Sequence, residues 1–332
     1  MATISDVAAR AGVSTATVSR ALNGKSTVDP ELASRVRAAA KELGYRPNGL
    51  ARNLRRQETA VLALIISDVE NPFFTAIARG VEDTAQAGGF QVVLCNSDEN
   101  ADKERRYVEV ALSERAAGVI VSPSGLPGSL DPLFDSGTPV VAVDRRMPDR
   151  SCDMVLVHSR LAARQATEHL IEQGYQRIAC LTGPEGVPTA DDRAAGYRDA
   201  LVGTGRREVL RRAEYRAPGA QVAASELLGG PERPDALLVG NSAMAVGVLG
   251  AMRAHGLRAG IDLGLVSFDD APWTTLLEPQ LSVVAQPAYQ IGVQATRLLL
   301  ARIADPGRLP STVTLDARLI ARGSSSRSPG SP

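Results

Sequence analysis

The chain has 332 residues, 44% of them hydrophobic, and its 37 Lys and Arg residues balance its 37 Asp and Glu residues. A chain of this length and composition is expected to bury a large core and to form more than one domain. It contains no run of about 18 apolar residues that could span a membrane, and its amino terminus lacks the cationic start and apolar stretch of a secretory signal, so we predict a soluble cytoplasmic protein.

The first 23 residues are predicted to form two short helices joined by a tight turn. Thr3 is a good N-cap for the first helix, with Asp6 three residues on, and Gly12 ends it. Ser14 is a second good N-cap. The second helix leaves small hydroxyl and methyl groups and one arginine outside, at Thr15, Ala16, Ser19 and Arg20. This outer face suits the major groove of DNA, although an amphipathic hairpin that merely packs would have the same pattern.

Positive charge gathers at the same end of the chain. Residues 1–60 hold ten Lys or Arg and five Asp or Glu, a formal net charge of +5, so the rest of the neutral chain carries −5. A third helix is predicted from the N-cap Asp29, followed by Pro30, to Leu43, with Gly44 as its left-handed stop. A basic head of three short helices on an acidic body is typical of a nucleic-acid-binding protein.

The linker after this head places Leu50, Ala51 and Leu54 on one side of a predicted short helix and arginines on the others. Such a helix is too short to be stable alone in water, and Gly49 costs roughly 1 kcal/mol more than Ala would. We expect it to form only where an apolar partner meets Leu54 and an anionic partner meets the arginines. The alternative is a flexible charged tether.

From Val61 onwards, short aliphatic runs alternate with helical segments. The predicted strands are 61–67, 91–97, 118–124, 139–145, 154–159, 177–183, 210–215, 235–240 and 264–270. The predicted helices begin near Pro72, Lys103 and Leu130 and then cover 160–173, 192–202, 219–228 and 243–255. Aliphatic runs separated by helices predict buried parallel strands, and hence an α/β body of two doubly wound subdomains.

In such sheets, ligands bind beyond the carboxyl ends of the strands. The polar and aromatic residues at these ends are Asn71 to Phe74, Asn96 to Asp98, Asp144, Thr189 to Arg193, Asn241 and Asp269. Each alone is better explained as a solvated loop residue or a helix cap, but their common placement predicts a cleft.

Motifs of catalysis are absent from the sequence. We find no H-E-x-x-H, Walker loop, G-x-G-x-x-G or G-x-S-x-G. The three cysteines and three histidines are scattered, which favours buried free thiols over a disulfide or metal site. We therefore predict that the protein is not an enzyme and holds no cofactor or metal.

The sequence resembles the LacI/GalR family of bacterial transcriptional repressors from Thr3 to about Ser324. The likeness is carried by TISDVAARAGVSTATVSRALN, GYRPNGLARNLR, NPFFTAIARGVEDTAQAGGFQVVLCNSDEN, PVVAVDR, HLIEQGYQRIACLTGP, VSFDD and LDARLIARGS. It implies a helix-turn-helix head at 1–46, a hinge helix and linker at 47–60, and a periplasmic-binding-protein-like body. The subdomains of this body would be 61–159 with 287–317 and 160–286 with 318–324. The Ser-, Pro- and Gly-rich residues 325–332 are predicted to be a disordered tail.

The resemblance also implies which residues act. Those that would contact DNA are Thr15, Ala16, Thr17, Arg20, Asn23, Arg52, Leu54 and Arg55, with Leu54 wedged into the minor groove. Those that would bind a small effector are Phe74, Asp144, Thr189, Arg193, Tyr215, Asn241 and Asp269. In sugar-binding relatives the carboxylates and the arginine hydrogen-bond to hydroxyls, and an aromatic side chain stacks on the ring.

Departures from the family pattern bear on the identity of the effector. His158-Ser159 stand where relatives commonly have Asp-Asn, and Ser242 stands where Asp is usual. Val187 occupies the position of a base-contacting arginine in the purine-responsive relative, although other residues of the predicted pocket fit a purine. We predict a sugar or sugar-like effector, with a purine as the alternative.

The predicted function is that of a homodimeric repressor. It would bind double-stranded operator DNA in a sequence-specific manner, under allosteric control by the effector between the two subdomains. The alternative from another class is a solute-binding protein of a transport system, because the body alone would fit one. The absent secretion signal and the basic amino-terminal end oppose that alternative.

Overall fold

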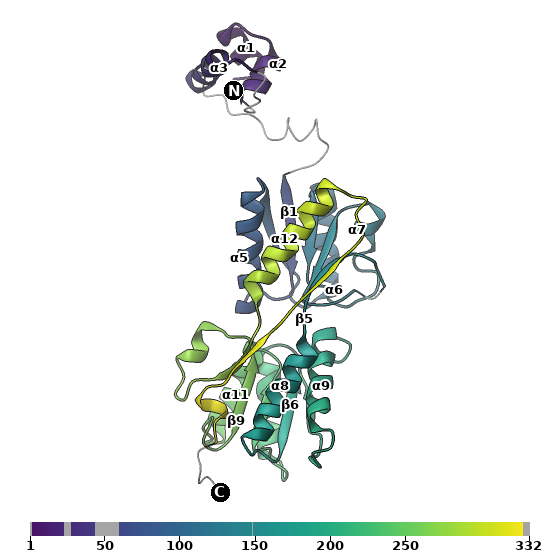
Figure 1. Cartoon of the computed structure of the whole chain (residues 1–332), viewed down its shortest axis with the longest axis vertical. Coiled ribbons are helices and arrows are strands. Elements are labelled where there is room, and N and C mark those ends of the chain that lie inside the picture. The colour runs from purple at the N-terminus through teal and green to yellow at the C-terminus, as the bar shows by residue number, and fades with distance from the viewer. Residues whose placement is uncertain (1, 23–27, 44–59, 148, 328–332) are drawn as a thin grey trace. The chain divides into compact units, whose positions relative to one another are not determined.

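The computed structural model of the protein describes residues 2–22, 28–43, 60–147 and 149–327. The chain divides into two compact units, residues 1–59 and 60–332, which we call the head and the body (Figure 1). The predicted hinge helix falls between the described parts and lies outside the described residues.

Within its described residues, the head has the three predicted helices, α1 (Ile4–Ala11), α2 (Thr15–Leu22) and α3 (Pro30–Glu42). The local caps confirm the predicted boundaries. Thr3 Oγ1 accepts a hydrogen bond from the N–H of Asp6 at 3.3 Å, Asp6 Oδ2 accepts one from the N–H of Thr3 at 2.8 Å, and Gly12 ends α1 with a φ of 66°. Asp29 Oδ1 likewise accepts from the first turn of α3.

The core of the head consists mainly of valine and alanine. Val7, Val18 and Val36 are fully buried at its centre. On α3, Leu32 and Leu43 are only half-buried, and alanines dominate the buried face. The buried face of α3 is made of Ala33, Val36, Ala39 and Ala40. Small side chains let short helices approach closely, so three of them enclose a continuous core despite their length.

The first lobe of the body is built on a sheet of six described strands in the order β11-β5-β4-β3-β1-β2, all parallel. Its strands are β1 (Val61–Ile66), β2 (Gln91–Asn96), β3 (Gly118–Val121), β4 (Val140–Val143), β5 (Asp153–Val157) and β11 (Thr312–Leu315). Its helices are α5 (Pro72–Ala87), α6 (Ala101–Ser113), α7 (Asp131–Asp135) and α12 (Ala288–Ala304). Leu62, Leu64 and Ile66 pack in one cluster with α5 and α12, whereas Ala63 and Ile65 pack with α6 and α7, so helices cover both faces of the sheet.

The second lobe repeats this plan with the described order β12-β10-β9-β8-β6-β7. Its strands are β6 (Ile178–Thr182), β7 (Leu210–Arg212), β8 (Ala236–Val239), β9 (Gly264–Phe268), β10 (Ser282–Ala285) and β12 (Arg318–Ile320). Its helices are α8 (Ser159–Glu172), α9 (Pro188–Leu201), α10 (Ala217–Gly229), α11 (Ser242–Ala254) and the short 3-10 turns η1 (Pro272–Thr275) and η2 (Gly323–Ser325). The predicted α/β fold is confirmed, although β12 pairs antiparallel to β10, which the sequence did not indicate.

In the described body, the chain passes between the lobes three times. It does so between β5 and α8, between β10 and α12, and between β11 and β12. The last crossing can be followed in Figure 1 as the yellow chain that runs diagonally from the first lobe to the second. Because the strands of both sheets are almost all parallel, each lobe has one edge where its strands end, and ligand sites of such sheets lie there.

Two predicted boundaries next to effector residues were wrong. Helix α9 begins at Pro188, four residues before the predicted start, because Pro188 occupies the first helical position, where its missing N–H costs nothing. Arg193 therefore lies in the second turn of the helix. The strand predicted to reach Tyr215 ends at Arg212, so Tyr215 lies in the loop before α10.

The predicted disordered tail also needs correction. Residues 325–327 are part of the folded body. Ser325 is fully buried, and its hydroxyl lies 2.8 Å from His169 Nε2 and 2.7 Å from Ser282 Oγ. Arg327 donates to the carbonyl of Gly174 at 2.8 Å. The partners of this segment are far away in the sequence, which is why its polar composition resembles that of a disordered tail.

Two further observations concern the chain as a whole. None of the described helices is long and apolar enough to cross a membrane. The three cysteines are buried and unpaired, as predicted, and burial raises the pKa of the Cys152 thiol to about 11 and that of the Cys180 thiol to about 12. A thiol that keeps its proton is a poor nucleophile and a poor metal ligand. These cysteines are therefore structural residues of the core.

Candidate functional site

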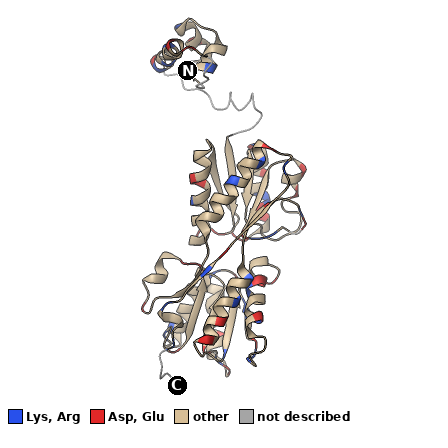
Figure 2. Cartoon of the chain, in the orientation of Figure 1, with Lys and Arg blue, Asp and Glu red and all other residues tan. Residues whose placement is uncertain are grey.

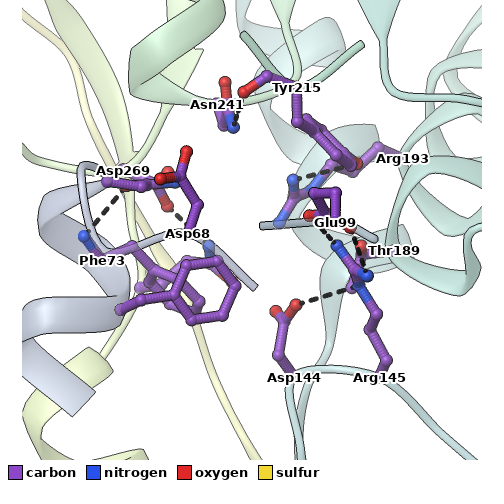
Figure 3. A pocket seen from close by; sticks show the side chains of 13 residues that line it. Asp68, Phe73, Glu99, Asp144, Arg145, Thr189, Arg193, Tyr215, Asn241 and Asp269 are labelled. Carbon is purple, nitrogen blue, oxygen red and sulfur yellow. Dashed lines mark hydrogen bonds and ion pairs between the residues drawn. The ribbon is translucent and has the colours of Figure 1, made fainter. Parts of the chain in front are cut away.

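A pocket lies between the two lobes at the carboxyl ends of their strands (Figure 3). The empty space between the lining atoms, open mouth included, is about 360 Å³. The pocket is lined by every residue predicted to bind an effector, namely Phe74, Asp144, Thr189, Arg193, Tyr215, Asn241 and Asp269. The sequence pattern placed Asn71 and Phe73 at a strand end but did not assign them to the effector site. Both residues line the pocket.

Two buried carboxylates occupy equivalent places in the two lobes. Asp144 directly follows β4 and Asp269 directly follows β9, and these strands have the same position in their sheets. Both residues have a left-handed backbone, with φ of 65° and 71°. The N–H of Asp144 donates to Val155 at 3.1 Å and that of Asp269 to Val284 at 3.0 Å, in the neighbouring strand. A left-handed conformation costs a non-glycine residue of order 1–3 kcal/mol. The hydrogen bonds at the strand ends therefore hold both residues in a backbone conformation that is unfavourable by itself.

Burial disfavours the charged form of both carboxylates. It raises the pKa of Asp144 to about 6, although the neighbouring Arg145 and Arg193 oppose the rise. It also raises the pKa of Asp269, against the opposing effects of Arg193 and of a hydrogen bond from Gln286 Nε2 at 2.7 Å. A ligand hydroxyl that donates to these carboxylates would restore part of the hydration that they lose on folding.

Arg193 is held in a fixed orientation on the second lobe. Its Nη1 donates to the carbonyl of Gly240 at 2.6 Å and lies 3.4 Å from the hydroxyl of Tyr215. Its guanidinium carbon lies 4.2 Å from the centre of the Phe268 ring and 5.9 Å from that of Tyr215. Stacking and hydrogen bonding together fix the plane of this guanidinium group, which is a preorganised donor.

Arg145 and Glu99 form the corresponding pair on the first lobe. Arg145 is 2% exposed, and its two terminal nitrogens donate to the two carboxylate oxygens of Glu99 at 2.8 and 2.6 Å. The third nitrogen, Nε, lies 3.6 Å from Asp144 Oδ2. Figure 3 shows Arg145, Glu99 and Arg193 along one side of the pocket, opposite Asp269 and Phe73.

Sequence reasoning missed the lining residues Asp68, Glu99, Arg145 and Gln286. Arg145 could have been found, because it directly follows Asp144 at a predicted strand end. Glu99 lies one residue beyond the predicted strand-end segment Asn96 to Asp98, and Gln286 follows β10, which was not among the predicted strands. Conversely, Asn96 and Asp98 of that segment do not line the pocket: Asn96 Oδ1 accepts from the N–H of Val69 at 3.1 Å, and Asp98 pairs with Arg216.

Three buried polar atoms of the lining residues have no hydrogen-bond partner within the described chain. They are Nε of Arg145, Nε of Arg193 and Oε1 of Gln286. Buried polar atoms are almost always paired, and an exception calls for an explanation such as a ligand. These two donors and one acceptor lie beside the carboxylates of Asp144 and Asp269. The set matches a ligand that carries several hydroxyl groups.

Aromatic side chains supply an apolar surface beside these polar groups. Phe73 and Phe74 lie in the first turn of α5, where the side chain of Asn71 accepts from the N–H of Phe73 at 3.0 Å. Their rings meet edge to face, with centres 5.1 Å apart and an angle of 72°. Tyr215 contributes a further aromatic side chain from the second lobe. Such faces bind the C–H surface of a sugar ring as well as the face of a base.

In the head, three of the four predicted DNA-contacting residues on α2 face outward. Thr15, Ala16 and Arg20 are exposed, and Arg20 Nε donates a long hydrogen bond of 3.3 Å to the carbonyl of Ala16 on its own helix. Thr17 is half-buried, and its hydroxyl lies 2.9 Å from that of Ser14, which caps α2 by accepting from the N–H of Thr17 at 3.2 Å. The other predicted contacts, Asn23, Arg52, Leu54 and Arg55, lie outside the described residues.

Comparison with known proteins gives two family matches. Residues 3–48 match the model of bacterial regulatory proteins of the lacI family, and residues 167–325 match that of a periplasmic binding protein-like domain. The chain is 39% identical to a ribose operon repressor of Halalkalibacterium halodurans over 303 residues, which is 91% of each chain. It is also 33% identical to the HTH-type transcriptional repressor CytR of Escherichia coli K12, over 97% of this chain and 96% of that protein.

Solved structures are similar along almost the whole chain. The lac repressor dimer bound to operator and the anti-inducer ONPF matches with a TM-score of 0.87 and 26% identity, over 98% of this chain and 99% of that chain. A complex of the transcriptional regulator CelR with cellobiose matches with a TM-score of 0.73 and 30% identity, over 98% of this chain and 100% of that chain. The similarity therefore covers both the head and the body.

Proposed function

Because the chain belongs to the LacI family of bacterial regulatory proteins, we propose that it is a repressor that binds operator DNA as a homodimer and is controlled by a monosaccharide. The relatives are named repressors, which agrees with the absence of catalysis predicted from the sequence. A solute-binding protein of a transport system is disfavoured, because the lacI-family match covers the head.

We assign the DNA contacts to the head and linker and the effector contacts to the body. Thr15, Ala16, Thr17, Arg20 and Asn23 would read bases or position α2, and Arg52, Leu54 and Arg55 would act in the linker. The effector lobes would be 61–159 with 287–317 and 160–286 with 318–324. Exposure of Thr15, Ala16 and Arg20 supports the first assignment, and the clustering of the predicted effector residues around one pocket supports the second.

The charge of the pocket favours a neutral ligand. Among the described lining residues, four carboxyl groups face two guanidinium groups. The carboxyl groups belong to Asp68, Glu99, Asp144 and Asp269, and the guanidinium groups to Arg145 and Arg193. Glu99 already takes both terminal nitrogens of Arg145, so little positive charge remains for a phosphate. A sugar phosphate would meet the repulsion of buried carboxylates, whereas a neutral polyol would donate hydrogen bonds to them.

The proposal is carried by two buried carboxylates on left-handed residues of the two lobes, beside an aromatic surface and buried arginine nitrogens that have no hydrogen-bond partner within the described chain. The pocket is small, and one similar protein is named a ribose operon repressor. We therefore take D-ribose as the probe. Val187, which bears on the purine alternative, is the N-cap residue of α9 and does not appear among the pocket-lining residues.

The test uses the full-length protein. Isothermal titration calorimetry should detect binding of D-ribose and no binding of ribose 5-phosphate or hypoxanthine. Operator fragments selected from random DNA by the protein should then show a ribose-dependent change in affinity by fluorescence anisotropy. Binding of hypoxanthine alone would establish the purine alternative, and failure to select any DNA sequence would refute the repressor.

A further inference from the structure

Two ion pairs join the lobes next to the pocket. Arg146 Nη2 of the first lobe lies 2.7 Å from Asp192 Oδ1 of the second, and Arg216 of the second lobe pairs with Asp98 of the first. Other ion pairs of the described body, such as Arg302–Asp153 in the first lobe and Arg160–Asp199 in the second, join residues of the same lobe. We call Arg146–Asp192 and Arg216–Asp98 the interlobe pairs.

Each member of the interlobe pairs is the sequence neighbour of a pocket residue. Arg146 follows Arg145, and Asp98 precedes Glu99, so both are attached to the Arg145–Glu99 pair of the first lobe. Asp192 and Arg216 are the neighbours of Arg193 and Tyr215, which contact each other on the second lobe.

The interlobe pairs thus connect the two halves of one pocket wall. One half is Glu99 and Arg145 of the first lobe, and the other is Arg193 and Tyr215 of the second. Figure 3 shows Glu99 and Arg145 of the first lobe near Arg193 and Tyr215 of the second. The halves come from different lobes, and a rotation of one lobe against the other changes the distance between them. The backbone at Asp98 and Glu99 is left-handed, with φ of 62° and 55°, so the position of this segment depends on its tertiary contacts.

We propose that Arg146 and Arg216 are positioning residues of the effector pocket. Through Asp192 and Asp98 they hold the two wall halves at the spacing that the effector needs, without touching the effector. The proposal rests on the proposed function, because it concerns the same pocket. An effector that binds only when the wall is assembled has its apparent affinity reduced by the fraction of molecules in which the wall is open.

The interlobe pairs are partly exposed, which sets the size of the effect. The side chains of Arg146 and Asp192 are 49% and 26% exposed, and those of Arg216 and Asp98 are 37% and 42% exposed. Pairs of this kind change an equilibrium by a factor of about two to five. Salt screens them, because the Debye length falls from about 10 Å at 0.1 M to about 3 Å at 1 M ionic strength. Effector affinity should therefore decrease as salt is added.

The chain offers a matched control for each interlobe pair. Lys103 Nζ lies 3.6 Å from the same carboxylate of Asp98, but both residues belong to the first lobe. Arg160 Nε lies 2.7 Å from Asp199 Oδ2 and links α8 to α9 within the second lobe. Figure 2 shows basic and acidic residues interspersed along these two helices. Removal of either control pair should leave the spacing of the lobes unchanged.

The first experiment measures D-ribose binding to the full chain by calorimetry at low and high NaCl. Arg146→Asp and Arg216→Asp should each weaken binding by a factor of about two to five or more, and should reduce its salt dependence. The swap Arg146→Asp with Asp192→Arg should restore the affinity, whereas Lys103→Ala and Arg160→Ala should leave it unchanged. A swap that fails to restore affinity, or equal losses in the control variants, would overturn the proposal.

The second experiment measures lobe spacing without any ligand, so that it does not depend on ribose being the effector. Spin labels at Glu109→Cys on α6 and Glu226→Cys on α10 use exposed positions of the two lobes, and the native cysteines are buried. Labelled chains are mixed with an excess of unlabelled chains to suppress pairs between subunits. The double reversal Arg146→Asp with Arg216→Asp should shift the distance distribution. An unchanged distribution would refute the positioning role, whereas a shift without ribose binding would refute only the choice of ribose.

Discussion

The head and the pocket hold their functional side chains in opposite environments. On α2, Thr15, Ala16 and Arg20 are exposed, whereas Asp144 and Asp269 in the pocket are only 8% and 5% exposed and have left-handed backbones. Exposed groups remain hydrated in the folded protein, so they can be removed with little effect on stability. Buried charged groups lose hydration on folding and regain it only through partners. Substitutions of the buried pocket residues should therefore change stability as well as binding. Substitutions of the exposed residues on α2 should change DNA binding alone.

The largest expected effect is on pH-dependent stability. Burial raises the pKa of Asp144 to about 6, so the native state binds this proton more tightly than the unfolded state does. The resulting stabilisation is present below about pH 4 and is lost as the pH rises through about 6. At 1.36 kcal/mol per pKa unit, Asp144→Asn should be more stable than the parent by about 3 kcal/mol at pH 7 and equal to it at pH 4.

Urea unfolding of the full chain between pH 4 and pH 8 measures this difference. Asp316→Asn is the control, because its side chain is 86% exposed. A stability difference that does not vary with pH would contradict the role of burial at Asp144.

The next effect concerns effector binding. Asp269→Asn keeps the shape of the side chain but removes the charge that accepts from Gln286 and, by our assignment, from the ligand. The loss of a charge-assisted hydrogen bond costs about 1.5–3 kcal/mol. Ribose binding by calorimetry should weaken accordingly, while operator affinity without ribose stays within a few fold. If the variant kept the ribose response of the parent, the effector site would have to lie elsewhere.

A comparable or smaller effect is expected on α2. Arg20→Ala should cost about 1–3 kcal/mol at the selected operator and relax the preference at one base-pair position of each half-site. Unfolding of the protein should be unaffected, because Arg20 is exposed. Binding to a panel of single-base operator variants measures this, with Arg37→Ala on the exposed side of α3 as the charge-matched control. Uniform weakening on every sequence would make Arg20 a phosphate contact instead.

The smallest effect tests how the head is stabilised. Thr3→Ala removes the hydroxyl that caps α1 and should destabilise that helix by about 1 kcal/mol. Amide hydrogen exchange in the full chain should become faster in α1 and remain unchanged in the body. Thr3→Ser should restore protection, and Ser5→Ala, at an exposed position within the helix, is the control. Faster exchange throughout the body would show that the loss is not local to the head.

The sequence by itself determined the local features of both regions. The caps at Thr3 and Asp29, the stop at Gly12 and the outward face of α2 depend on residues within a few positions of each other. The same holds for the alternation of strands and helices. Since parallel strands end at one edge of a sheet, the sequence alone predicts that Asp144 and Asp269 lie at a common cleft.

Only the tertiary structure decided what depends on distant partners. The bond of Ser325 to His169 places a polar, Ser-rich segment in the folded body. The pairing of Arg145 with Glu99 joins residues 46 positions apart. The interlobe contact of Arg216 with Asp98 spans 118 positions. Sequence patterns report the environment of a residue along its own helix or strand, whereas these contacts arise because folded sheets bring separate strand ends together.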